Sequence, residues 1–242
     1  MTWSILARDE TTGYFGIAIA SRFFAVGGTC PWARGRIGIA SSQALMNPML
    51  GHRGLELLAT GMAPEAARDQ LLTEDQGVGH RQFHLMDWDG RWAQHTGVEC
   101  IDWCGGDGRD GLSVAGNMLA GPDVVAQTIA AYEANIDADL VERLLSAMEA
   151  GEAAGGDRRG KQAAGILVQG DDPYPRLSLR VDDHADPLAE LRRLAEVAKD
   201  RFVAFTTLAY PTPEHPHGIT DRERIEAAIE RNGGRPLGAK RT

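Results

Sequence analysis

Two segments of this 242-residue chain carry polar residues in patterns that could do chemistry: the opening MTWSILAR and the glycine-rich AGGDRRGKQAA. Thr2 starts an apolar, alternating segment directly after Met1. Chain ends fray unless something holds them, so a strand that begins at the second residue, with no leader ahead of it, predicts a role for the N-terminus itself. Thr2 is the candidate for that role. The plainer interpretation is that a β-branched residue simply begins a strand.

The segment AGGDRRGKQAA predicts a binding loop for an anion. Its glycines allow close approach of the backbone, and a guanidinium group presents a planar fork that fits a carboxylate. Arg158 or Arg159 would hold a carboxylate of the substrate, with Asp157 fixing the arginine and Gln162 hydrogen-bonding nearby. The alternative is a turn at the end of a sheet, stapled by an Asp–Arg pair of small energetic value. Both interpretations stay open.

Three further polar residues stand in or near the last residues of expected strands, at points where a pocket could form. Asn117 in GNMLAG stands between apolar residues, and its side-chain amide would either donate to an oxyanion or staple the loop. Gln43 and Asn47 in SSQALMNP would line a pocket, or Asn47 would make the turn before Pro48. The segment GNMLAG is no phosphate loop, because the Walker spacing and its Lys-Ser/Thr pair are absent.

The cysteines give weaker signals. Cys30, Cys100 and Cys104 are odd in number, which favours reduced thiols over a disulfide framework. No nearby His or Cys completes a tetrahedral set with Cys100 and Cys104, so no metal is expected. Cys30 could be reactive, although a small packed thiol is the commoner case. The sequence contains neither Gly-x-Ser-x-Gly nor His-Glu-x-x-His, so rival nucleophiles are weak.

The composition limits the classes of partner. With 43% hydrophobic residues the chain can bury a large core. A net charge of −9 argues against non-specific attraction to nucleic acids or anionic membranes, since both are polyanions. The sequence has no apolar run of about 18 residues and no basic region followed by an apolar stretch, so neither a spanning helix nor a signal peptide is expected. A cytoplasmic location follows as the expectation.

Apolar periodicity predicts the elements that must position these residues. Strands are expected over residues 2–7, 15–21, 36–44, 81–97 (a hairpin around Asp89-Gly90), 111–121, 161–170 and 176–182, and helices over 51–60, 64–72, 122–135, 137–151, 187–205 and 220–234. Asp137 is the expected cap of its helix. The strands come in two batches, each followed by a pair of helices, which favours mostly antiparallel sheets in an α+β fold of four layers: helix, sheet, sheet, helix. The main domain is expected over residues 1–210, and a Pro-rich linker with a short helix over 211–242.

The chain resembles an uncharacterised family, the domain of unknown function number 1028. The resemblance covers roughly residues 2–210, and its most specific segments are ASRFFAVG and AGGDRRGKQAA. Members of that family look like N-terminal nucleophile (Ntn) hydrolases in fold, so the resemblance implies a four-layer αββα sandwich here. It does not imply a substrate.

The same resemblance implies roles for residues at the chain start. In hydrolases of that fold the first residue after processing attacks an amide, and its own α-amino group, with a pKa of about 8, accepts the proton. Thr2 would take this role once Met1 is removed. Ser21 could then hydrogen-bond the amine, and Arg22 could meet a negative group. Without the fold analogy, Ser21 and Arg22 are an exposed strand end followed by Phe23 and Phe24 in the core.

Three hypotheses of function follow. The first is an amide hydrolase that acts with Thr2 on a small, carboxylate-bearing substrate and needs no cofactor. The second is a catalytically silent protein of the same fold that binds a small carboxylate ligand. The third is an assembly role, in which the helix from Pro187 pairs with a second subunit. The partners expected are a small-molecule substrate and a second copy of the chain in a homodimer, and neither nucleic acid nor membrane.

Overall fold

The computed structural model describes residues 2–235, and in this part of the chain ten strands form two antiparallel sheets. The six-stranded sheet has the order β10-β9-β2-β1-β8-β7, and the four-stranded sheet has the order β3-β4-β5-β6. The strands are β1 (Thr2–Arg8), β2 (Phe15–Ser21), β3 (Pro31–Arg34), β4 (Gly38–Ala44), β5 (Arg81–Asp87), β6 (Trp92–Thr96), β7 (Trp103–Arg109), β8 (Leu112–Leu119), β9 (Ala163–Gln169) and β10 (Leu177–Val181). The α+β class and the antiparallel pairing expected from the sequence are confirmed.

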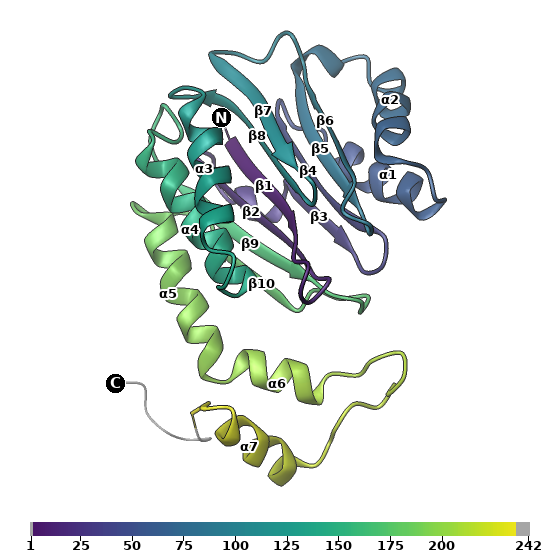
Figure 1. Cartoon of the computed structure of the whole chain (residues 1–242), viewed down its shortest axis with the longest axis vertical. Coiled ribbons are helices and arrows are strands. Elements are labelled where there is room, and N and C mark those ends of the chain that lie inside the picture. The colour runs from purple at the N-terminus through teal and green to yellow at the C-terminus, as the bar shows by residue number, and fades with distance from the viewer. Residues whose placement is uncertain (1, 236–242) are drawn as a thin grey trace. The chain divides into compact units, whose positions relative to one another are not determined.

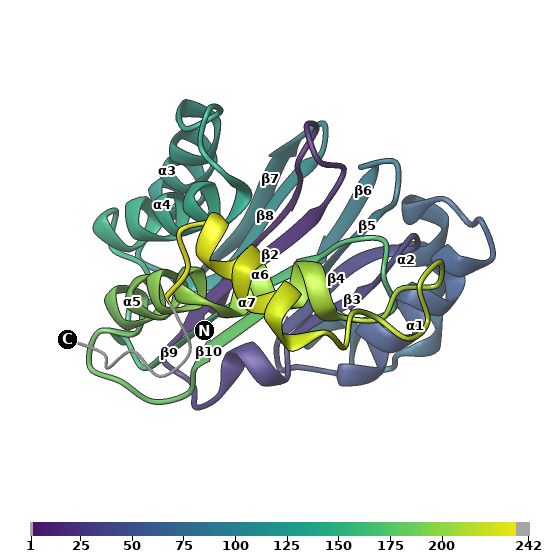
Figure 2. The ribbon, with the colours of Figure 1, turned by 90° about the horizontal axis from the view of Figure 1, so that it is seen from below.

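Helices cover both sheets (Figures 1 and 2). The helices are α1 (Pro48–Ala59), α2 (Pro64–Glu74), α3 (Asp123–Ala134), α4 (Leu140–Ala153), α5 (Pro187–Asp200), α6 (Phe202–Ala209) and α7 (Arg222–Arg231), with short 3-10 turns at Val26–Gly28 and Val78–His80. Helices α1 and α2 pack against the four-stranded sheet, and α3 and α4 against the six-stranded sheet. The inner faces of the sheets meet where β1 and β2 contact β4 and where β8 contacts β5 and β6.

Strand β1 is buried on both faces, and its alternation decides which residues lie between the sheets. Leu6 packs with Ile39 and Met86 of the four-stranded sheet, so the even-numbered residues of β1 face that sheet. Trp3 faces the helices, against Gly151 of α4. Thr2 and Ser4 therefore bring hydroxyl groups into the space between the sheets.

The sequence-based prediction missed two strands, β3 and β7. Strand β7 reads WCGGDGR, and its glycines resemble a loop in a propensity argument. The glycines are needed because a Cβ on Gly106 would collide with Gln94, and one on Gly108 would collide with Trp92. The close contact between β7 and β6, and not side-chain propensity, therefore explains why glycines occupy this strand.

Two helix boundaries also differ from the prediction. Asp139, not Asp137, caps α4: its carboxylate accepts a hydrogen bond from Glu142 N at 2.9 Å. The helix expected over residues 187–205 ends at Asp200, and α6 begins after Arg201, whose φ of −150° is not helical. The hairpin around Gly90 is confirmed, with the glycine at φ +86°.

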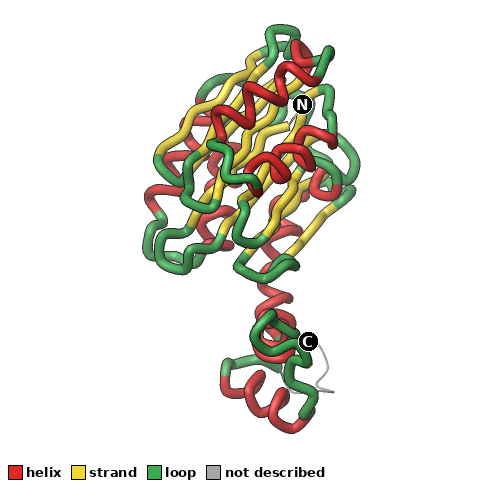
Figure 3. Tube along the Cα trace, turned by 90° about the vertical axis from the view of Figure 1, so that its right-hand side faces the viewer, coloured by secondary structure: helices red, strands yellow, loops and turns green. Residues whose placement is uncertain are grey.

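The chain divides into two compact units, residues 1–191 and 192–242. The domain boundary at residues 210 and 211 stays a prediction. In the described part of the second unit, α6 and α7 pack through Ala209, Ile225 and Ile229, and the regular structure is helical (Figure 3). Among residues 2–235, no helix has the length and apolar character needed to cross a bilayer.

Candidate functional site

Thr2 lies between two other polar residues at one end of the six-stranded sheet. It starts β1, between the last residue of β2, Ser21, and Asn117 of β8, with which it pairs in register. Thr2 Oγ1 donates a hydrogen bond to Ser21 Oγ at 3.1 Å, and all three residues are buried. The structure therefore brings together three residues that the sequence singled out separately.

A cluster of side-chain amides holds the backbone of Thr2. Asn117 Nδ2 lies 3.3 Å from Thr2 O and 2.9 Å from Gln82 Oε1. Gln43 Nε2 donates to Gln82 Oε1 at 2.9 Å and lies 3.5 Å from Thr2 O. Both hydrogens of Asn117 Nδ2 thus have acceptors inside the protein, and donation to an oxyanion would require this amide to release one of them.

Gln82 is a residue of this cluster that the sequence reasoning missed. Its Nε2 donates to Gly116 O at 2.7 Å and lies 2.9 Å from Thr96 Oγ1. It links β5 to β6 and β8 and is fully buried. A polar residue at an alternating, inward position of β5 was the available signal, because a buried amide needs partners.

A second buried network continues inward from the amide cluster, and the sequence reasoning missed it too. Ser4 Oγ lies 2.8 Å from Gln43 Oε1 and 2.8 Å from His84 Nε2, and His84 Nδ1 lies 3.0 Å from Ser113 Oγ. All four side chains are at most 1% exposed. Burial lowers the pKa of His84 to about 3.

The hydrogen-bond accounting argues against Ser4 as a nucleophile. Ser4 has one hydroxyl hydrogen, which it donates to Gln43 Oε1. His84 Nε2 must then donate to Ser4 Oγ, and Nδ1 must accept from Ser113. In this tautomer neither ring nitrogen of His84 can accept the Ser4 proton, because Nε2 carries a hydrogen and Nδ1 already accepts from Ser113. The network therefore holds the two sheets together and does not activate a serine.

The glycine-rich loop crosses the same end of the sheet. Asp157 accepts hydrogen bonds from Arg22 N at 2.7 Å and Arg159 N at 2.8 Å, and it pairs with the Arg159 guanidinium at 3.2 Å. On the other side, Arg158 N donates to Met118 O at 3.4 Å. Because β1 lies between β2 and β8, the loop spans the end of the strand that Thr2 begins.

Replacing Asp157 by alanine is expected to lower the free energy of unfolding by about 2–3 kcal/mol, because the backbone N–H groups of Arg22 and Arg159 lose a buried, charged acceptor. The matched control is Asp107→Ala, which removes an equally spaced but exposed pair with Arg109 and should cost less than about 0.5 kcal/mol. Urea denaturation of both variants checks this. Equal losses would show that the Asp157 carboxylate does not anchor the loop.

Two of the sequence-based candidates make contacts of other kinds. Asn47 caps α1, accepting from Met49 N at 3.0 Å, and donates to Asp75 at 2.9 Å, as the turn interpretation expected. The hydrogen bond from Arg81 lowers the pKa of Asp75 to about 2. Gln162 donates to Asp183 at 3.0 Å.

Arg158 and the two phenylalanines lie toward solvent. Arg158 pairs with Asp102 at 2.9 Å, with more than half of its side chain exposed. Phe23 and Phe24 are 57% and 61% exposed, so their expected place in the core is wrong. They follow Arg22 on a segment that leaves the sheet at the end of β2, where no inner face remains to receive them.

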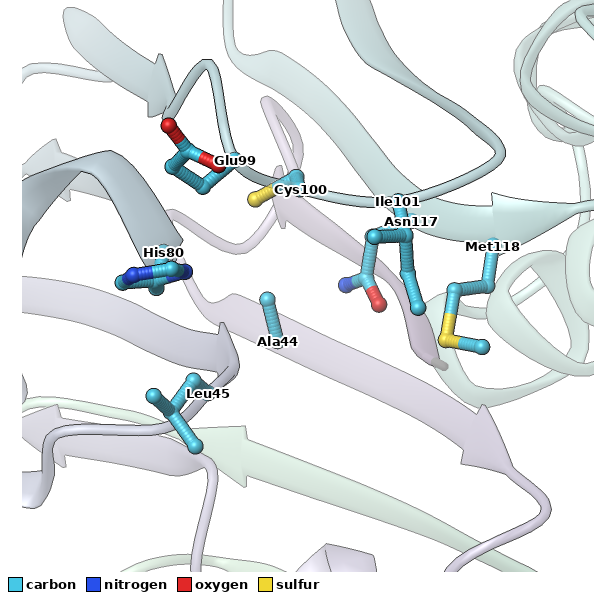
Figure 4. A pocket seen from close by; sticks show the side chains of 8 residues that line it. All are labelled: Ala44, Leu45, His80, Glu99, Cys100, Ile101, Asn117 and Met118. Atoms are coloured by element: carbon cyan, nitrogen blue, oxygen red, sulfur yellow. The ribbon is translucent and has the colours of Figure 1, made fainter.

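A cavity of about 320 Å³ opens beside Asn117 (Figure 4). It is lined by Ala44, Leu45, His80, Glu99, Cys100, Ile101, Asn117 and Met118. These residues come from the ends of β4 and β8 and from the loops before β5 and before β7. Asn117 is common to this cavity and to the amide cluster around Thr2: the residue that lines the cavity also hydrogen-bonds the Thr2 carbonyl, although Thr2 itself does not line the cavity.

Backbone strain is concentrated at this cavity. Ala44 and Met118, which line it, have φ of +68° and +52°, in the left-handed region that disfavours residues with a Cβ. Met118 belongs to a bulge in β8, where the register with β7 shifts between Trp103 and Gly105. Strain of this kind costs about 1–3 kcal/mol per residue and accumulates at functional sites.

The cysteines do not form a competing centre. Burial raises the pKa of Cys30 to about 12, and burial also raises the pKa of Cys100 and Cys104. Thiols of raised pKa are poor nucleophiles. Within residues 2–235, no group of three or more His, Cys, Asp or Glu side chains is arranged to hold a metal ion.

The fold and the site define an α+β protein with two facing antiparallel sheets and a polar site at one end of them. The chain belongs to the family described as "Family of unknown function (DUF1028)", whose model matches residues 2–191. The chain is also similar to the crystal structure of protein SPO2555 from Silicibacter pomeroyi, assigned to the same family, with 33% sequence identity and a TM-score of 0.85 over 91% of this chain and 96% of that one. No curated protein matches the chain.

Proposed function

We propose that this protein is an amide hydrolase of the Ntn type, built as a four-layer αββα sandwich, with Thr2 as its nucleophile. The observation that carries the proposal is the position of Thr2. It begins a central strand, its hydroxyl lies 3.1 Å from Ser21 Oγ, and its carbonyl is bonded to Asn117 next to a cavity.

The proposed reaction uses the Thr2 side chain and its own backbone nitrogen. Removal of Met1 frees the α-amine, which has a pKa of about 8 when unperturbed and can accept the Oγ1 proton near neutral pH. Oγ1 attacks the amide carbon, the C–N bond breaks, and the leaving nitrogen takes the proton. Water then hydrolyses the threonyl ester and releases the acid. Ser21 orients the hydroxyl in this scheme.

The arginines of the glycine-rich loop, together with Arg22, favour a substrate that carries a carboxylate. The guanidinium groups of Arg158 and Arg159 pair with Asp102 and Asp157. The Arg22 guanidinium donates to a neutral carbonyl, Arg159 O, so within residues 2–235 its charge is not paired with a carboxylate. A guanidinium group binds a carboxylate through a planar fork.

A second candidate function is binding of the same ligand without turnover. Two observations favour it: Thr2 is only 5% exposed, and both hydrogens of Asn117 Nδ2 are engaged inside the protein. A protein that binds a carboxylate ligand unchanged after long incubation would support this candidate.

The intact mass of the purified protein tests the hydrolase first. We expect a mass lower by one methionine residue and an N-terminal sequence that starts TWSILAR. Protein from its natural source that retains Met1 would contradict the mechanism, because Thr2 would then lack a base. The measurement needs no knowledge of the substrate.

A further inference from the structure

The residues around Thr2 differ sharply in character on its two sides. On the side between the sheets lies the cavity, whose wall includes the apolar side chains of Leu45, Ile101 and Met118. On the other side, the loop that follows α4 brings Arg159 to Arg22 at the end of β2, whereas Arg158 of the same loop lies beside Met118 and is paired with Asp102. A ligand that passes Thr2 therefore meets an apolar environment at one end and a cationic environment at the other.

The apolar wall is not part of the protein core. Leu45 and Ile101 are 63% and 60% exposed, although apolar side chains of this size are ordinarily buried. A cavity of about 320 Å³ lies at the small end of the range for ligand sites. Apolar side chains held at the mouth of such a cavity suit a short hydrocarbon group, which would cover them.

Charge determines which end of the ligand enters the cavity. Glu99 lines the cavity and is exposed, so a carboxylate there would meet a like charge. Arg22 is exposed on the opposite side and uses Nη1 to donate to Arg159 O at 2.7 Å, which leaves the rest of its fork for a carboxylate. The anionic end of the ligand is thus directed to Arg22.

We infer that the ligand is an amide that joins a short apolar acyl group to a carboxylate-bearing amine, an N-acyl amino acid, with the acyl group in the cavity and the carboxylate at Arg22. The inference rests on the proposed function for the position of the scissile bond at Thr2. Hydrolysis would consume one water, transfer the acyl group to Thr2 Oγ1, and release first the amino acid and then the fatty acid.

The test is calorimetric titration of the full-length Thr2→Ala variant with N-acylglycines whose acyl chains run from two to eight carbons. We expect affinity to rise about fourfold for each methylene until the cavity is full, because each buried methylene contributes a similar increment. The matching N-acylglycinamides, which lack the carboxylate, should bind about three- to tenfold more weakly, and Arg22→Gln should remove that difference.

Substitutions at the cavity mouth identify the acyl site. Ile101→Trp should fill the cavity and abolish the dependence on chain length, and Leu45→Trp should do the same. Val98→Trp is the matched control, because Val98 lies in the same loop, is 92% exposed and does not line the cavity. It should bind as the unsubstituted protein does.

Affinity that is independent of chain length, or equal effects of Ile101→Trp and Val98→Trp, would overturn the inference. Failure of the proposed function would look different. In that case the chain-length dependence would persist in the titrations, while protein with an intact Thr2 would release no amine from the bound N-acylglycine.

Discussion

Replacing Thr2 by alanine is expected to abolish hydrolysis, with a loss of at least about 10⁴-fold in kcat, because the variant has no oxygen to form the acyl intermediate. The fold should survive, since the substitution removes one buried hydroxyl and its 3.1 Å hydrogen bond to Ser21. That loss is worth about 1–2 kcal/mol, or about 2–8 °C in Tm for a chain of this size. Rates on N-acyl amino acids and thermal melts check both parts.

The conservative variant Thr2→Ser is the control for this experiment. A serine hydroxyl keeps the attacking oxygen and the bond to Ser21, so measurable turnover should remain. Ser21→Ala should reduce kcat by a smaller factor than Thr2→Ala, because Ser21 orients the nucleophile without forming a bond to substrate. Full activity in Thr2→Ala would remove Thr2 from the mechanism.

The second large effect concerns stability in acid. Burial lowers the pKa of His84 to about 3, whereas an unfolded histidine has a pKa of about 6.5. Between these values the unfolded chain binds a proton that the folded chain does not, so the free energy of unfolding falls as the pH falls from about 6.5 to 3. The slope from this residue approaches about 1.4 kcal/mol per pH unit, and its total over the whole titration reaches about 5 kcal/mol.

His84→Gln should lack this component, because glutamine does not titrate. At pH 7 the variant is expected to have a lower free energy of unfolding than the natural protein, because Ser4 and Ser113 lose well-placed partners. This gap, the difference in free energy of unfolding between the two proteins, should narrow steadily toward pH 3. Urea denaturation at pH 7, 5 and 4 measures the gap. A constant gap for His84→Gln would mean that His84 is accessible to protons in the folded state.

Much of the secondary structure could be predicted because its causes are local. The alternation in β1 and β2, Gly61 between the first two helices, and the turn at Gly90 all follow from side-chain spacing or from a positive φ. Strand β7 could not be predicted, because its glycines are required by contacts with Trp92 and Gln94 on another sheet. An argument from local strand propensity does not take contacts with another sheet into account.

The candidate site shows the same division. Thr2, Asn117 and the segment around Asp157 attract notice in the sequence because polar groups beside apolar strands need partners. Residue spacing could not predict that these residues lie close together, because residues 2, 21, 117 and 157 meet only through the strand order β2-β1-β8. Asn47 shows the converse: its cap on α1 is a local interaction, and the turn interpretation from the sequence was sufficient.

By itself the sequence determined the α+β class and the antiparallel hairpins, because these depend on periodicity and on turn residues close in the chain. Only the tertiary structure decided that Ser4, Gln82 and His84 form a buried network and that a cavity lies beside Asn117. Hydrogen bonds and cavities between two sheets depend on which strands face each other, and that relation joins residues too far apart in sequence for any local pattern to encode it.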